Sequence, residues 1–483
     1  MMKQIKKSIV AVMSSLVWFG SLALVLVASA SASAREYVFT PEKTDEMRAL
    51  LGGGCLKPGD RVVMKDGVYH LGDLDFFAEG TRSDSISLCA ENPGKAVVSG
   101  PLRFRIYGTY LKVDGLFFNK AWASGFSMIE FRKDKGENAT HCRLSNCVID
   151  DCNDPDKSEA PAPKGQMPMS VAEYWVGLYG SNHRVDHCYF ANKRIGGLVI
   201  QLWLDEDSHI NNHQIDHNLF GFRKPYGGNG AEIIRVGHSW SSQLESHAII
   251  ENNVFLHCDG ENEIISVKSC NNVLRRNLFF ESRGALVCRH GHYNVVEGNT
   301  FVGNDIKGTC GVRIINQGHT VYDNLMCRLQ GWGLLVRVGI HDRPTPDTDL
   351  EKEPLTTFHR AENVDIAYNH FIDCRAMEFG SGKGEKMPRN VRFAYNNIFG
   401  PQSNISLFRP DETLPGFYFL GNSYGFTDKG TIELEGFHPA QPTVDYAAIE
   451  RERVLSSLSG TGAAWYGPNI RDLSYIQSKY MEL

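Results

Sequence analysis

The amino-acid sequence predicts an all-β protein folded as a parallel β-helix, and two observations lead to this prediction. A short phrase recurs along the chain, in which an Asn is followed by any residue and then by a large apolar residue. The segments between these phrases are rich in Val, Ile, Phe and Tyr, with Asn and Gly at the breaks. This composition favours short strands and turns, and long stretches with the 3.6-residue period of a helix are absent.

The recurring phrase returns at nearly regular intervals. It is centred on Asn146, Asn218, Asn253, Asn277, Asn299, Asn324, Asn369, Asn396 and Asn422. From Asn253 onward the intervals are 24, 22, 25, 45, 27 and 26 residues. Repeats of this length that hold short strands are the coils of a β-helix. The interval of 45 predicts one coil plus an insertion, for which the polar, Pro-containing residues 341–360 are the candidate.

The repeated asparagines predict a ladder of side chains. Asn tolerates left-handed turn conformations, and stacked Asn amides can bond one coil to the next. We therefore expect Asn253, Asn277 and Asn299 to stack at one corner of successive coils. A leucine-rich repeat also carries an Asn, but its Leu-x-x-Leu-x-Leu frame is absent here.

The chain is expected to have three parts. Residues 1–34 have the features of a signal peptide: a basic start, a long apolar run and Ala-Ser-Ala at the end. The alternative is an uncleaved membrane anchor, because the apolar run is long for a signal; no later stretch is apolar enough to span a bilayer. We expect a secreted or periplasmic protein, with a β-helix over residues 35–430 and a C-terminal extension, residues 431–483, packed on the end of that helix.

The charge balance argues against a nucleic-acid partner. The full chain has 50 Lys and Arg against 56 Asp and Glu, and removal of residues 1–34 leaves 47 against 56. An acidic protein binds a polyanion only through a local basic patch. The 12 cysteines match no metal motif in their spacing. Several lie in apolar runs, so most are expected to fill the core, while pairing of some in an exported protein stays open.

Two carboxylates on one side of a strand predict a metal site. Glu261 and Glu263 lie in the segment CDGENEIISVKSCNN, and residues two apart in a strand face the same side. Such carboxylates repel unless a cation lies between them, and oxygen ligands favour Ca²⁺, which also accepts an Asn carbonyl. Asn229, in GGNGAEIIRVG, precedes Glu261 by 32 residues, about one longer coil, so it can stack beside them. A solvated acidic edge is the alternative interpretation.

Three basic residues follow at the coil spacing. Arg289 comes 21 residues after Lys268, and Arg313 comes 24 residues after Arg289. We expect the three to form a column with about 5 Å between coils. Like charges in a column repel, so an anionic ligand explains them better than folding does. His290 is expected to contact that ligand, and a zinc site with His292 is not expected, because no third ligand is evident.

These segments resemble polysaccharide lyase family 6, which contains alginate lyases and chondroitinase B. The resemblance lies in NGAEIIRVG, in the run E-x-E-x-x-x-x-K, and in RHG followed by N-x-V-x-G-N, and it extends more weakly through most of the chain. It implies a right-handed parallel β-helix. It also implies that Lys268 is the Brønsted base and Arg289 the catalytic arginine, and that His290 and Arg313 bind substrate.

The resemblance further implies that Asn229, Glu261 and Glu263 bind Ca²⁺. The expected reaction is β-elimination on an acidic, uronate-containing polysaccharide. Removal of the proton on C5 places charge on the uronate carboxylate, which Ca²⁺ and Arg289 can stabilise. Neighbouring positive charge lowers the pKa of Lys268, so that some neutral amine is present to act as the base.

Other interpretations are kept open at this stage. The most favoured substrate is alginate, with dermatan sulfate or chondroitin sulfate as the alternative. A glycoside hydrolase on the same scaffold would need two carboxylic acids at catalytic spacing and no lysine. A non-catalytic, glycan-binding β-helix would form no product. The sequence does not define endo or exo action, block preference or oligomeric state.

Overall fold

The computed structural model describes residues 34–161, 173–205, 209–401, 405–407, 414–428 and 430–481. The predicted signal peptide therefore lies outside the described residues, except for its last residue. Residues 35–483 cluster as one compact unit, which holds both the predicted β-helix and the C-terminal extension. In the described ranges, we find no helix with the length and apolar character needed to cross a membrane.

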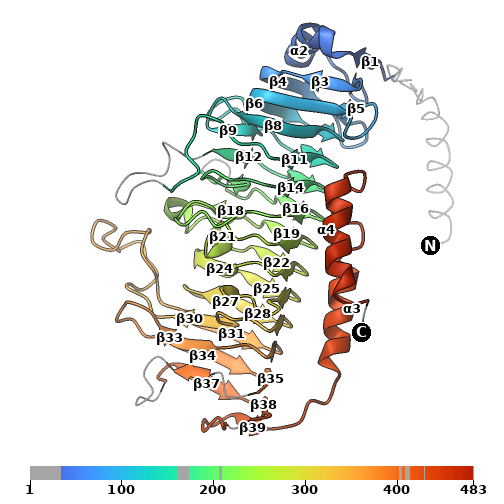
Figure 1. The fold of residues 1–483 in the computed structure, drawn as a ribbon. Coiled ribbons are helices and arrows are strands. Elements are labelled where there is room, and N and C mark those ends of the chain that lie inside the picture. Colours follow the sequence, from blue (N-terminus) through green and yellow to red (C-terminus); the bar gives the residue numbers. More distant parts are fainter. Residues whose placement is uncertain are drawn as a thin grey trace, which may run out of the picture. The chain divides into compact units, whose positions relative to one another are not determined.

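Three parallel sheets wind around one apolar core, which confirms the predicted right-handed parallel β-helix (Figure 1). Sheet 1 contains β1 (Glu36–Phe39), β2 (Arg61–Met64), β5 (Ile86–Ala90), β7 (Leu111–Asp114), β10 (Arg143–Ser145), β13 (Arg184–Asp186), β16 (Gln214–Asp216), β19 (Ile249–Glu251), β22 (Val273–Arg275), β25 (Val295–Glu297), β28 (Thr320–Tyr322), β31 (Glu362–Ala367), β34 (Arg389–Ala394) and β37 (Phe417–Leu420).

The other two sheets share the long strand β6 (Ala96–Thr109), which pairs with strands of both. Sheet 2 continues with β3 (Gly67–Tyr69), β8 (Phe117–Ala123), β11 (Val148–Asp150), β14 (Tyr189–Ala191), β17 (Leu219–Phe220), β20 (Val254–Leu256), β23 (Leu278–Phe280), β26 (Thr300–Val302), β29 (Leu325–Cys327), β32 (His370–Ile372), β35 (Asn397–Gly400), β38 (Asn422–Phe426) and β39 (Phe437–Pro439). Sheet 3 continues with β4 (Gly72–Glu79), β9 (Ser127–Glu130), β12 (Tyr174–Leu178), β15 (Ile200–Leu202), β18 (Ile234–Gly237), β21 (Glu263–Lys268), β24 (Gly284–His290), β27 (Thr309–Ile314), β30 (Leu334–Arg337), β33 (Met377–Ser381) and β36 (Ile405–Leu407).

Helices lie outside the three sheets. The 3₁₀ helix η1 (Pro41–Lys43) and the helix α2 (Thr44–Gly52) follow β1, and α2 buries Met47 and Leu51 against the first coils. A second 3₁₀ helix, η3 (Ser239–Ser241), follows β18. The helices α3 (Tyr446–Ser457) and α4 (Gly467–Ser478) belong to the C-terminal extension.

The predicted asparagine ladder is confirmed at the corner between sheets 1 and 2. The Nδ2 of Asn253 donates to the Oδ1 of Asn277 at 3.1 Å, and the Nδ2 of Asn277 donates to the Oδ1 of Asn299 at 3.0 Å. Equivalent bonds link the whole run from Asn218 to Asn422. Each amide also accepts a backbone N–H from the preceding coil, so these buried groups are paired.

Two details of the ladder prediction are wrong. The left-handed conformation belongs to the residue before each ladder Asn, such as His217 before Asn218, because the chain turns there and the amide follows the turn. Asn146 is not a ladder member: it has the left-handed conformation itself, with φ 53°, and Cys147 takes the ladder position. The backbone N–H of Cys147 donates to the Sγ of Cys188 at 3.4 Å.

The cysteines fill the core, as predicted. Ten of the 12 are buried, Cys310 is half-buried and Cys55 is exposed. The aromatic core follows the same coil period: Phe190, Phe220, Phe255, Phe279 and Phe301 stack in order with ring centroids 4.5–5.2 Å apart.

The insertion also lies where the spacing predicts it. Residues 341–360 fall between β30 and β31, while the ladder continues beneath them through a 2.9 Å bond from Asn324 to Asn369. The extra residues therefore leave the coil without breaking its hydrogen bonds, and they fold over the outer side of sheet 3, where Phe358 contacts Arg289.

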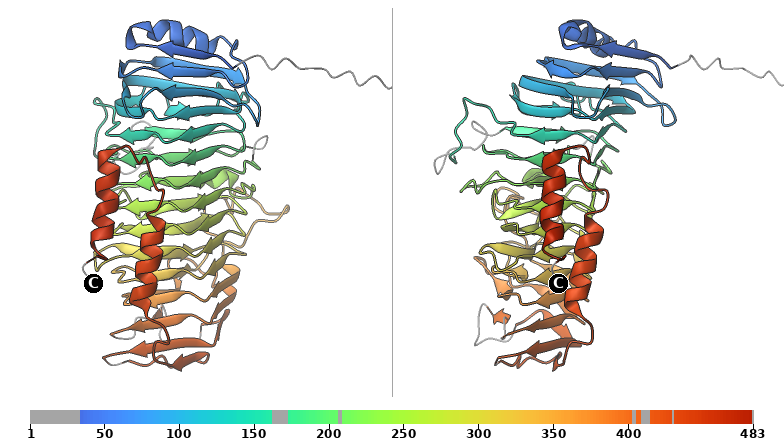
Figure 2. Two further views of the ribbon diagram at one scale, coloured as in Figure 1. Left: turned by 90° about the vertical axis from the view of Figure 1, so that its right-hand side faces the viewer. Right: turned by 45° about the vertical axis from the view of Figure 1, so that its right-hand side comes forward.

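The prediction that the C-terminal extension packs on the end of the β-helix is wrong. Helices α3 and α4 lie along the flank of the coils, over sheet 2 (Figure 2). The reason is an apolar stripe on the outer side of sheet 2, where Val254 and Leu278 are fully buried against the helices, with Val454 of α3 and Ile476 of α4 in the same cluster. The strands themselves continue beyond residue 430, because β39 pairs with β38.

Candidate active site

Three carboxylates from two successive coils meet on the outer side of sheet 3. Glu263 begins β21, Glu261 lies two residues before it, and Glu232 lies two residues before β18. One carboxylate oxygen from each residue lies within 4.8 Å of the others. Glu261 and Glu263 therefore converge, as their two-residue spacing predicts, and the third member comes from the neighbouring coil.

The carboxylate cluster is largely buried, and its negative charges act on one another. Burial, followed by the charges of Glu232 and Glu263, raises the pKa of Glu261 to about 9. Burial also raises the pKa of Glu263, but Arg313, Arg289 and Lys268 outweigh it and leave that pKa below its usual value. The Oε2 of Glu232 is buried without a hydrogen-bond partner, so this oxygen has unused capacity to accept a proton or a cation.

Lys268, the last residue of β21, lies beside this cluster. Its Nζ is 3.9 Å from the Oε1 of Glu232, and 13% of its side chain is exposed. Burial lowers the pKa of Lys268; Glu232 opposes this shift, and Arg235 and Arg289 reinforce it. The arrangement gives a lysine that can lose its proton more readily than a surface lysine, at the outer face of the sheet.

Arg289 and Arg313 converge on one carboxylate. The Nε of Arg289 is 3.6 Å from the Oε1 of Glu263, and a guanidinium nitrogen of Arg313 is bonded to the same oxygen. The other carboxylate oxygen of Glu263 accepts the hydroxyl of Ser266 at 2.5 Å. The two ion pairs and this hydrogen bond together fix the position of Glu263 within the cluster.

The predicted column of Lys268, Arg289 and Arg313 is wrong in its register. Lys268 pairs with His290, and Arg313 pairs with Val287, which pairs with Ser266. The pairing of β21 with β24 contains two register shifts, the second of which passes over Arg289. Bulges of this kind re-aim side chains near active sites, and they bring the three cations toward one carboxylate cluster although they are not in one column.

The histidines are neutral members of this region. His290 is 1% exposed, and burial together with Arg289 and Lys268 lowers its pKa to about 2. His292 is fully buried and stacks on His359 with ring centroids 6.2 Å apart. The group of possible metal ligands found among the described residues consists of Glu232, Glu261 and Glu263.

The insertion covers the arginine side of the site. The ring of Phe358 lies 4.4 Å from the Cζ of Arg289 and 4.9 Å from the Cζ of Arg337. The same ring stacks on His290 with centroids 6.2 Å apart. Both guanidinium groups thus contact the electron-rich face of an aromatic ring.

Sequence reasoning missed Glu232, Arg337 and Phe358. A signal for Glu232 was available, because Glu-Ile-Ile occurs at both 232 and 263, and the register pairs Ile234 with Ile265. No short pattern marks Phe358, since its contact depends on how the insertion folds back. Asn229 is exposed, and the next residue, Gly230, donates its N–H to the Oε2 of Glu261 at 3.1 Å.

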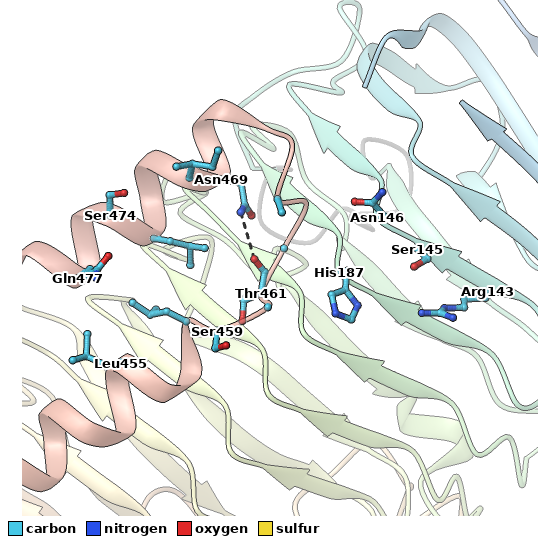
Figure 3. A pocket seen from close by; sticks show the side chains of 16 residues that line it. Arg143, Ser145, Asn146, His187, Leu455, Ser459, Thr461, Asn469, Ser474 and Gln477 are labelled. Carbon is cyan, nitrogen blue, oxygen red and sulfur yellow. Dashed lines mark hydrogen bonds between the residues drawn. The ribbon is translucent and has the colours of Figure 1, made fainter. Parts of the chain in front are cut away.

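A cavity of about 760 Å³ lies elsewhere, between the C-terminal helices and the corner of sheets 1 and 2 (Figure 3). Its walls include Arg143 and His187 from the coils and Leu473 from α4. None of the predicted site residues lines it. The predicted site residues lie instead on the outer side of sheet 3, on and beside β21, β24 and β27.

Comparisons with known proteins place this chain in a class of enzymes. The family model described as Chondroitinase B matches residues 53–414. A solved mannuronic acid specific polysaccharide family 6 lyase from human gut microbiota is 56% identical over 92% of this chain and 99% of its own, with a TM-score of 0.89. The class is therefore that of the polysaccharide lyases.

A second solved structure agrees. The PL6 family alginate lyase AlyGC is 32% identical, with a TM-score of 0.75 over 85% of this chain and 54% of that chain. The protein belongs to polysaccharide lyase family 6. A search of the curated proteins finds no match.

Proposed function

We propose that this protein cleaves alginate by β-elimination and prefers blocks of mannuronate. The observation that carries the proposal is the 56% identity, over 92% of the chain, to a lyase described as mannuronic acid specific. The site supports it, because Lys268 lies on the outer face of sheet 3 beside Arg289 and a carboxylate cluster. Export to the periplasm or the medium, where the polymer is found, accompanies this function.

The residues of the cluster fit a calcium ion. Glu232, Glu261 and Glu263 offer oxygens within 4.8 Å of one another, and the Oε2 of Glu232 has no hydrogen-bond partner. Hard oxygen ligands of this kind suit Ca²⁺. We assign these three carboxylates and Asn229 to the site. When bound, the ion would supply positive charge beside the carboxylate of the uronate.

The protein's own residues carry the proton transfers. The neutral amine of Lys268 takes the proton from C5 of the uronate, and Arg289 holds the carboxylate on which the charge develops. The C5 electron pair forms the C4–C5 double bond as the C4–O4 bond breaks, and the departing O4 takes up the proton that Lys268 removed from C5, which returns the lysine to its neutral form. No water is consumed.

His290 and Arg313 complete the proposed substrate contacts. His290 is in register with Lys268, and its low pKa keeps it neutral. A neutral imidazole can donate or accept a hydrogen bond with a sugar hydroxyl or with O4 without adding charge. Arg313 is bonded to Glu263, so its substrate contact would come from its remaining N–H groups.

The test is a panel of purified polymannuronate, polyguluronate and dermatan sulfate, followed by ultraviolet absorbance of the unsaturated product. We expect the fastest rise with polymannuronate, loss of activity in excess chelator, and recovery with added Ca²⁺. A response to dermatan sulfate alone would favour the second candidate, a chondroitinase B-like lyase, which the description of the matching family supports. Cleavage without ultraviolet absorbance would indicate hydrolysis, and binding without cleavage would indicate a glycan-binding protein.

A further inference from the structure

Trp240 is an exposed indole with one face already covered. It exposes 68% of its surface, more than any other large hydrophobic residue in the described part of the chain. Its ring stacks on the imidazole of His238, with centroids 4.9 Å apart and 19° between the planes. Since one face lies on His238, solvent reaches chiefly the opposite face. Exposed indoles are costly in water and often mark binding surfaces.

The backbone holds this pair directly beside Lys268. Gly237 pairs with Lys268 in the register of β18 and β21. Its φ is +77°, and a Cβ at this position would lie 2.8 Å from the carbonyl oxygen of Lys268, so only glycine permits so close an approach of the two coils. His238 is the next residue, and the charge of Lys268 contributes to the lowered pKa of its imidazole, after burial and Arg235.

Hydrogen bonds hold the turn that carries Trp240 against the coil of Lys268. The N–H of His238 donates to the Oγ of Ser241 at 2.9 Å. The N–H of Cys270 donates to the carbonyl of Leu244 at 2.9 Å, and the N–H of Ser246 donates to the carbonyl of Cys270 at 3.0 Å. An aromatic side chain on such a fixed turn can bind a ligand with little loss of conformational entropy.

The stack also extends away from the reacting centre. Behind His238 lie Trp203, with centroids 6.2 Å apart, and then Tyr179, 5.7 Å further and nearly parallel. The guanidinium of Arg132 covers the far end at 3.6 Å from the Tyr179 ring. The His238–Trp240 pair is therefore supported by the rings of Trp203 and Tyr179. The free face of Trp240 is left as the part of the stack that can receive a ligand.

We propose that Trp240 is a sugar-binding platform that receives the uronate ring adjacent to the one deprotonated by Lys268. One face of a pyranose ring presents C–H groups, which pack on an indole, while its carboxylate and hydroxyls stay at the edge. Neighbouring coils lie about 4.8 Å apart, close to the length of one sugar unit, so adjacent coils can serve adjacent sugars. The inference rests on the proposed function and names a further subsite of that site.

The test compares Trp240→Ala with Trp240→Phe on oligomannuronates of increasing length. We expect Trp240→Ala to raise KM about tenfold on long chains, as a lost aromatic contact does, with kcat within about twofold. Trp240→Phe should restore most of the affinity. Tyr418→Ala is the matched control, because Tyr418 is 60% exposed on β37 of sheet 1, and it should leave KM unchanged.

Binding is measured separately from turnover, in the Lys268→Ala background. Weaker oligomannuronate binding on addition of Trp240→Ala supports the platform, and equal affinity overturns it, whether or not the wild type is active. If the wild type forms no unsaturated product from any polyuronate, the proposed function fails and this binding comparison still decides the platform. A change from dimer to monomer in Trp240→Ala, with KM unchanged, would show that a second copy of the chain covers the indole and would overturn the proposal.

Discussion

Within the same coils, the hydrogen bonding is regular at the corner between sheets 1 and 2 and irregular on the outer face of sheet 3. At the corner, each ladder Asn repeats the same bonds to the coils on either side. On the outer face, the pairing of β21 with β24 shifts register twice. Buried polar atoms without partners occur there on Glu232, His290 and Arg313.

The difference teaches where stability and activity reside in this fold. A satisfied, periodic hydrogen-bond network stabilises every coil to a similar extent. Unpaired polar atoms and bulges cost stability, and they persist at sites where a ligand completes them. We therefore expect substitutions at the corner to change folding with little effect on catalysis, and substitutions on the outer face to do the reverse.

The largest expected effect tests the outer face. Lys268→Ala should lower turnover at least about a hundredfold, the usual contribution of a general base, with a thermal midpoint close to that of the wild type. Lys268→Arg should be nearly as damaging, because arginine stays protonated. Initial rates by ultraviolet absorbance and thermal unfolding give the two readouts. Near wild-type turnover in Lys268→Arg would make Lys268 a binding charge, and the base would have to be another residue.

The corner is tested by Asn277→Ala. The change removes bonds to Asn253, Asn299 and the carbonyl of Ile250 and leaves buried groups without partners. We expect the free energy of unfolding to fall by about 3 kcal/mol, with kcat per folded molecule unchanged at 25 °C. Denaturant titration and active-site titration measure the two quantities. A loss of kcat without a loss of stability would show that the two regions are not separate.

A pH experiment sharpens the comparison at a second ladder, which lies between sheets 3 and 1 and in which the Nδ2 of Asn272 donates to the Oδ1 of Asn294 at 2.9 Å. There His319 takes an acceptor position after Asn294, and burial lowers its pKa from 6.5 to about 4. The unfolded chain binds the proton first, so this stability is complete above pH 6.5 and is lost as pH falls toward 4. His319→Asn should reduce the stability lost between pH 7 and pH 5 by about 2 kcal/mol. An unchanged pH dependence in denaturant titrations would refute this assignment.

The smallest expected effect concerns the insertion. Phe358→Leu keeps an apolar side chain but removes the aromatic face that contacts Arg289 and Arg337. We expect kcat to fall about tenfold, equivalent to about 1.4 kcal/mol, with a smaller change in KM. Phe358→Trp should recover much of kcat. If Phe358→Leu and the wild type share the same kcat, the ring does not hold Arg289 in its working position.

The sequence allowed the coil architecture to be predicted, because the spacing of Asn253, Asn277 and Asn299 reports one hydrogen-bonded position per coil. The sequence also allowed Glu261, Glu263 and Lys268 to be predicted in one region, because successive side chains of a strand alternate between the two faces of the sheet. The register of Arg313 could not be predicted, because a bulge leaves no mark on residue spacing. The same holds for contacts between segments far apart in the sequence, such as Phe358 on Arg289.

The position of the C-terminal helices was predicted wrongly for a related reason. Their actual position has a consequence for how the chain folds. The hydroxyl of Tyr466 is bonded to Asp150, and Asp472 accepts the hydroxyl of Tyr189. The early coils are thus covered by residues that lie some 300 positions later in the chain. Until those residues are synthesised, the apolar stripe of sheet 2 is uncovered on the nascent chain, where exposed apolar surface favours aggregation. A chain that folds from its N-terminus therefore exposes, until these residues have joined it, an apolar surface that is buried in the finished enzyme.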